Sequence, residues 1–115
     1  MENIFGEELT KIRESCYPGL SLRRVGIILH QKHENEFGEY FYTQLYKMEA
    51  GTIIPSADLV HKILDAYGYP KGRRAHLMSL LSAVSAYARM HGISSHGPSV
   101  ERAAALLYRK VKKQK

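Results

Sequence analysis

The chain has 115 residues, of which 44% are apolar and 24% charged, and its formal net charge at pH 7 is +6. This length fits one compact domain, or one small domain with a helical extension, and argues against two independent domains. No apolar run approaches the roughly 18 residues that span a bilayer, and Met1 is followed by Glu2 instead of a basic and apolar signal segment. We therefore expect a cytoplasmic protein that makes no membrane contact.

The first two predicted helices follow from apolar residues at helical spacing. Residues 3–16 place four side chains on one face: Phe5, Leu9, Ile12 and Cys16. Pro18 and Gly19 end this helix, and Ser21 is a good N-cap for the next one. The second helix turns four side chains inward: Leu22, Val25, Ile28 and Leu29. Cys16, the chain's single cysteine, is interpreted as a buried thiol and not as a redox group.

A charged loop and a third helix come next. Residues 30–40 read HQKHENEFGEY and interrupt the apolar period, so they are predicted to form a loop. From Phe41 the period resumes with Leu45 and Met48, and Gly51 closes the helix. The opposite face of this third helix is polar and aromatic.

The rest of the chain is also predicted to be helical. Pro55 and Ser56 introduce a fourth helix that ends at Gly68, and a longer fifth helix follows between residues 73 and 91. After a short linker, a last helix has an apolar face made by Val100, Ala103, Ala104, Leu107 and Val111. The fold class expected is all-α.

Four segments resemble the phage-repressor-like (Xre/Cro) helix-turn-helix family. They read LTKIRE, LSLRRVG, LYKMEAG and IPSADLVHKILDAYG, and together they cover about residues 5–70. The resemblance implies a five-helix helix-turn-helix fold with a C-terminal helical extension, and residues 1–70 are assigned to the DNA-binding domain. Residues 71–115 are then a helical extension, with a possible dimerisation region and a basic tail.

The resemblance also implies particular residues that contact double-stranded DNA. The helix around 41–50 is expected to read the major groove. Its readers are Tyr42, Thr43, Gln44, Tyr46 and Lys47. Ser21, Arg23 and Arg24, at the start of the second helix, are expected to contact the phosphate backbone. Arg13 and Glu49 are expected to form a structural ion pair between the first and third helices.

The sequence departs from the family between the second and third helices, where the connection is about nine residues longer than the usual tight turn. It contains three acidic residues, Glu34, Glu36 and Glu39. An aromatic cluster surrounds it, consisting of Phe37, Tyr40, Phe41, Tyr42 and Tyr46. These rings either contact thymine methyl groups and sugars or pack the loop onto the core, and Phe41 is assigned to the core.

Positive charge is concentrated in the second part of the chain. Residues 1–70 hold 7 Lys and Arg against 10 Asp and Glu, whereas residues 71–115 hold 10 against 1. Arg73, Arg74 and the tail of residues 109–115 are candidates for nonspecific phosphate contacts, with solvated helix ends as the alternative interpretation.

Other chemistries are not expected. His30 and His33 lie near three glutamates, but their spacing matches no zinc signature, so neither a metal nor a cofactor is expected. No catalytic motif is found, and an enzyme is not expected. The sequence favours a homodimeric, sequence-specific transcriptional regulator, a repressor by resemblance. The alternative is a protein-interaction module, such as an antitoxin-like partner protein that uses the same fold.

Overall fold

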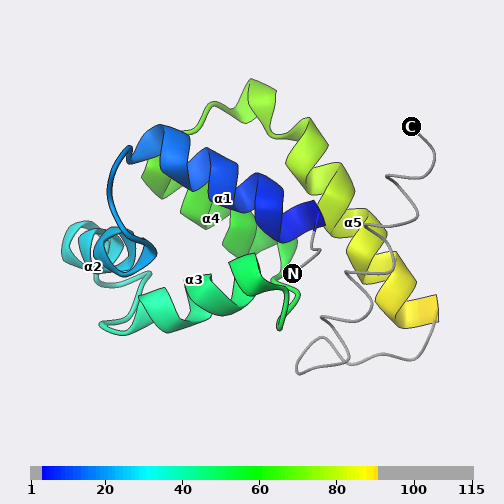
Figure 1. The fold of residues 1–115 in the computed structure, drawn as a ribbon, viewed down its shortest axis with the longest axis horizontal. Helices are drawn as coiled ribbons and strands as arrows, with labels where there is room; N and C mark the ends of the chain where they lie inside the picture. Colours follow the sequence, from blue (N-terminus) through cyan, green and yellow to red (C-terminus); the bar gives the residue numbers. More distant parts are fainter. Residues whose placement is uncertain (1–3, 91–115) are drawn as a thin grey trace.

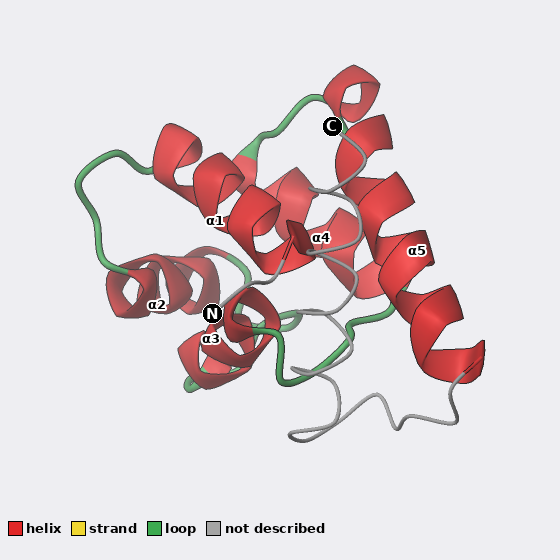
Figure 2. Cartoon of the chain, turned by 45° about the vertical axis from the view of Figure 1, so that its right-hand side comes forward, coloured by secondary structure: helices red, strands yellow, loops and turns green. Residues whose placement is uncertain are grey.

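The computed structural model describes residues 4–90, which form five α-helices and a short 3-10 turn (Figures 1 and 2). The helices are α1 (Ile4–Cys16), α2 (Leu22–Lys32), α3 (Phe41–Ala50), α4 (Ala57–Tyr67) and α5 (Ala75–Met90). No strand is present within this range, so the all-α prediction is confirmed for it. The last predicted helix and the basic tail lie outside the described residues.

The helix ends follow local backbone chemistry. Ser21 and Ser56 cap α2 and α4, because each hydroxyl accepts a hydrogen bond at 3.2 Å from the backbone N–H three residues later. Gly51 and Gly68 end α3 and α4 in the left-handed region, at φ 87° and 73°, where a side chain would be strained. The sequence places all four of these signals correctly.

The core lies between all five helices, because α2 also contributes Val25 and Leu29. Figure 1 shows α1 in front of α4, with α3 along the lower edge and α5 at one end of both. The largest fully buried side chains include Leu9, Leu45, Met48, Leu64 and Leu77. Because α5 supplies part of this same core, it packs directly on α1. Cys16 is only partly buried and packs against the edge of the core.

Helices α2 and α3 have the most extensive contact of any helix pair in the described residues. In Figure 1, α2 is seen nearly end-on while α3 runs across the view, so the two helices cross steeply. A Cβ atom added at Gly26 would lie 2.5 Å from Cβ and 2.7 Å from Cα of Tyr42. Only glycine permits this approach of the two backbones.

The connection between α2 and α3 differs from the sequence prediction at one end. The sequence predicts a loop from residue 30 onward, but α2 continues through His30 to Lys32. The imidazole Nδ1 of His30 donates a hydrogen bond at 2.8 Å to the carbonyl oxygen of Phe37. This contact, which sequence periodicity does not contain, draws residues 33–40 back onto the helix pair.

No helix among residues 4–90 has both the length and the apolar character required to cross a membrane.

Candidate nucleic-acid interface

The outward face of α3 carries most of the residues expected to read DNA. Thr43, Gln44, Tyr46 and Lys47 are exposed, whereas Phe41, Leu45 and Met48 on the opposite face are buried. Since side chains three or four positions apart on a helix are neighbours, the four exposed residues form one continuous surface. Tyr40, which precedes α3, extends this surface and is itself 64% exposed.

Tyr42 occupies a different position from the other expected readers. It is half-buried, because its backbone and Cβ lie against Gly26 of α2. The guanidinium carbon of Arg23 lies 5.4 Å from the centre of the Tyr42 ring, a cation–π distance. The ring of Tyr40 meets Tyr42 edge-on at 6.2 Å. Tyr42 therefore joins α2 to α3 and supports Arg23.

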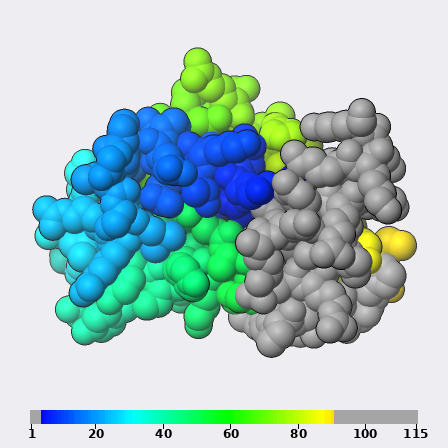
Figure 3. Space-filling model, in the orientation of Figure 1, coloured from blue at the N-terminus to red at the C-terminus, as the bar shows by residue number. Residues whose placement is uncertain are grey.

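The start of α2 brings positive charge beside this surface. Arg23 and Arg24 are exposed in the first turn of α2, which contains no acidic residue. Two cations near the positive end of a helix dipole are unfavourable unless an anion approaches. The hydroxyl of Ser21 caps the helix, so the backbone N–H of Arg24 is already occupied. Figure 3 shows the atoms of α2 and α3 side by side on one face of the molecule.

The expected ion pair between α1 and α3 is present in the structure. Arg13 Nε lies 2.8 Å from Glu49 Oε2, and Arg13 Nη2 lies 3.1 Å from Glu49 Oε1. Both side chains are at most 10% exposed, and Thr10 donates a further hydrogen bond to Glu49 at 2.7 Å. Burial alone would lower the pKa of Arg13, but the hydrogen bonds and charge of Glu49 outweigh it and raise that pKa. The pair fixes the end of α3 against α1.

Residues 33–40 form an anchored loop beside α3. The side chain of Phe37 is fully buried, and its ring lies 4.7 Å from that of Phe41. The acidic side chains of Glu34, Glu36 and Glu39 remain exposed. Of the two interpretations of the aromatic cluster, packing onto the core holds for Phe37 and Phe41, while Tyr40 and Tyr46 stay on the surface.

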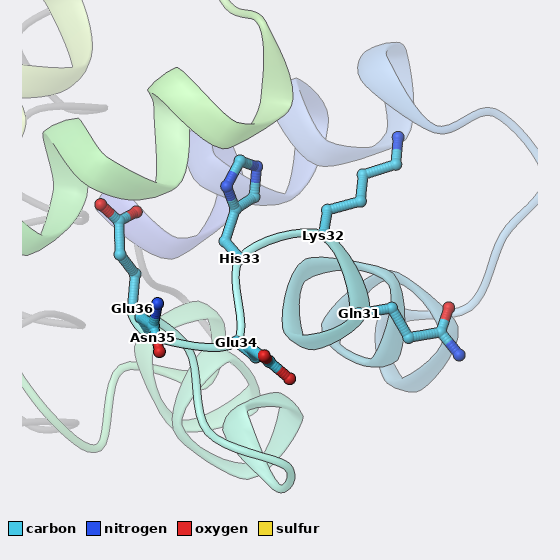
Figure 4. A pocket seen from close by; sticks show the side chains of 6 residues that line it. All are labelled: Gln31, Lys32, His33, Glu34, Asn35 and Glu36. Atoms are coloured by element: carbon cyan, nitrogen blue, oxygen red, sulfur yellow. The ribbon is translucent and has the colours of Figure 1, made fainter.

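The side chains that line the hollow at residues 31–36 do not point toward a common centre. Figure 4 shows its six side chains, from Gln31 to Glu36, fanning outward. Across residues 4–90, no three His, Cys, Asp or Glu side chains are grouped as metal ligands. The hollow is therefore an open, polar part of the surface.

Arg74, proposed from the sequence as a phosphate contact, is buried and internally bonded. It is 4% exposed and pairs with Asp65 at 2.8 Å. It also donates hydrogen bonds to the carbonyl oxygen of Tyr69 and to the His61 ring. This prediction is wrong because Arg74 joins the end of α4 to the start of α5. Arg73, in the preceding 3-10 turn (Lys71–Arg73), is exposed.

Sequence reasoning misses the close contact of Gly26 with Tyr42, and it leaves the burial of Phe37 as one of two alternatives. A glycine inside a predicted helix is a signal of close packing and was available for Gly26. Phe37 lies in a segment without periodicity, so the sequence does not decide between the two.

Comparison with known proteins gives no match among family models, curated proteins or solved structures. Function is therefore inferred from the chemistry of the surface that α2 and α3 share.

Proposed function

We propose that this protein is a sequence-specific DNA-binding transcriptional regulator that places α3 in the major groove. The observation that carries the proposal is the outward face of α3, where Gln44 and Lys47 are exposed together with Thr43 and Tyr46. The opposite face of this helix is buried in the core. An α-helix fits the major groove, and amide and ammonium groups form hydrogen bonds with base edges there.

The start of α2 supports the same proposal. Arg23 and Arg24 supply charge for phosphate contacts, which position a protein on the duplex without reading its sequence. The steep crossing of α2 and α3 agrees with the resemblance of LSLRRVG and LYKMEAG to helix-turn-helix proteins. In this proposal, α3 reads the bases and α2 holds the backbone.

The function is tested by selecting binding sites from a randomised duplex pool at near-physiological salt. The full-length protein is compared with Gln44→Ala and Lys47→Ala, and with Lys62→Ala as a matched control, because Lys62 is an exposed lysine on α4. We expect a defined motif that both α3 variants weaken or alter and that the control leaves unchanged. Removing the hydrogen bonds of one side chain with a base is expected to cost about 1–3 kcal/mol of discrimination.

Regulators of this type commonly act as dimers, and we propose a homodimer whose α3 helices meet half-sites about 34–36 Å apart. Sedimentation with and without DNA tests this proposal, together with the symmetry of the selected motif. A monomer at micromolar concentration in both conditions, with a motif that lacks two-fold symmetry, contradicts it. Bound over a promoter, such a dimer would act as a repressor.

A protein-interaction module is the second candidate, and the acidic loop favours it. Glu34, Glu36 and Glu39 are exposed next to α3 and would repel phosphate. Tyr40 and Tyr46 are the kind of exposed aromatic residue that anchors protein interfaces. If the pool yields no motif and all binding disappears at moderate salt, this candidate replaces the DNA-binding proposal.

A further inference from the structure

Of the chemical groups that α3 exposes, only the ammonium of Lys47 is of a kind that commonly binds guanine. Residues 40–50 contain no arginine, the residue most often bound to guanine in the major groove. The exposed groups are one amide, one lysine, one threonine and two tyrosine rings, from Gln44, Lys47, Thr43, Tyr40 and Tyr46. Lys47 is the one cation in this helix.

Thr43 offers its methyl group because its hydroxyl is engaged. The Thr43 hydroxyl donates a hydrogen bond at 2.8 Å to the backbone carbonyl of Tyr40, one turn earlier. The proton needed to donate to a base is therefore already used within the helix. What remains for a ligand in the groove is an apolar contact with the methyl group and a hydroxyl oxygen that can only accept a hydrogen bond.

The two exposed tyrosines add apolar area on the same surface. Tyr40 and Tyr46 are 64% and 63% exposed, although aromatic rings usually favour burial. Tyr46 lies one turn after Thr43, so these two side chains are neighbours on the helix surface, and Tyr40 lies at the start of the same helix as its N-cap. Gln44 is the next residue after Thr43, and Lys47 lies one helical turn after both Thr43 and Gln44.

An A·T base pair presents groups that match this surface. Adenine offers N7 and N6 to a bidentate amide, and thymine offers a C5 methyl group to apolar side chains. We infer that α3 reads a half-site dominated by A·T pairs, in which Gln44 binds adenine while Thr43 and Tyr46 contact thymine methyl groups. This inference rests on the proposed DNA-binding function and names the base pairs that the function requires.

The test removes single methyl groups from the DNA. After site selection with the full-length protein, each thymine of the best duplex is replaced in turn by deoxyuridine, which retains base pairing and the O4 acceptor. We expect binding to fall by about fourfold at one or more positions, the effect of removing one buried methyl group. The protein is the same in every measurement, so its folding cannot affect the result.

Two variants assign the methyl contacts to residues. Thr43→Ser retains the hydroxyl and removes only the side-chain methyl group, while Tyr46→Ala removes the ring and Tyr46→Phe retains it. We expect the deoxyuridine effect at one position to disappear in Thr43→Ser, and at another to disappear in Tyr46→Ala and persist in Tyr46→Phe. Such non-additive effects show direct contact.

The outcomes separate this inference from the function on which it rests. A selected motif rich in G·C pairs, or one that is insensitive to every deoxyuridine substitution, overturns the inference and leaves the DNA-binding function in place. The absence of sequence-selective duplex binding overturns both. An A·T-rich motif with methyl-dependent affinity supports both.

Discussion

At the scale of single residues, the hydroxyl of Tyr67 is the one buried side-chain oxygen without a hydrogen-bond partner in the described part of the chain. An unsatisfied buried donor costs about 1–3 kcal/mol, so Tyr67→Phe is expected to raise the free energy of unfolding by about 1 kcal/mol. The ring contact with Tyr17, at 5.6 Å, is retained. Urea denaturation measures the change, with the exposed Tyr46→Phe as a neutral control. A loss of stability in Tyr67→Phe would show that the hydroxyl is bonded after all.

The same residue makes a prediction about alkaline pH. Burial raises the pKa of Tyr67 far above its ordinary value of 10.0. Above that ordinary value the unfolded chain releases the phenol proton and the folded chain keeps it, so the stability falls by up to about 1.4 kcal/mol per pH unit. Urea midpoints measured from about pH 9 to pH 11 should therefore fall more steeply for the native protein than for Tyr67→Phe. Parallel profiles for the two proteins would contradict this assignment.

At the scale of elements, the contact between α2 and α3 depends on the absence of one side chain. Alanine is the better helix former by about 1 kcal/mol, yet Gly26→Ala would place a methyl group 2.5 Å from Cβ of Tyr42. The helices must separate, and we expect a net destabilisation of about 1–3 kcal/mol together with weaker DNA binding. Gly38→Ala is the matched control, because no atom lies within 4 Å of the added group. Equal stability of the two variants would mean that the helix pair adapts.

The loop between these helices is predicted to behave as a packed element. Phe37→Ala removes a fully buried ring and is expected to cost about 3–5 kcal/mol in unfolding free energy. Tyr40→Ala, in the same loop but 64% exposed, should change it by less than about 0.5 kcal/mol. Limited proteolysis should cut the loop sooner in Phe37→Ala than in Tyr40→Ala. Similar cleavage of both variants would show that Phe37 does not anchor the loop.

A structural feature is predictable from the sequence when the residues that determine it lie close together in the chain. Helix α4 is predictable nearly to the residue, because Ser56 and Gly68 are local signals at its two ends. The pair of Arg13 with Glu49 is expected from the resemblance to helix-turn-helix proteins, and the structure contains it. The buried position of Arg74 could not be predicted, because it depends on Asp65 and on the Tyr69 carbonyl, which only the folded chain brings to it. Site positions on regular helices are therefore the more predictable ones.

At the scale of the whole molecule, the charge is separated from the proposed reading surface. Residues 1–70, which include α3, have a net charge of −3, and residues 71–115 have one of +9. Base contacts carry specificity, while phosphate contacts carry most of the salt dependence. If the protein binds DNA as proposed, these two parts of the chain contribute different properties. Sequence specificity should come from residues 1–70, and much of the affinity from residues 71–115.

This division predicts the behaviour of a charge variant of the full-length chain. Replacing Lys110, Lys112 and Lys113 by glutamine should reduce the slope of log affinity against log salt by about 0.9 for each phosphate that is no longer neutralised, and so by up to about 2.7. The selected motif should not change. Replacing Lys11, Lys32 and Lys62 by glutamine removes the same charge from exposed positions within residues 1–70 and should alter the slope less. If the tail variant instead changes the motif while the slope stays constant, the C-terminal region reads bases, and the assignment of specificity to α3 alone is wrong.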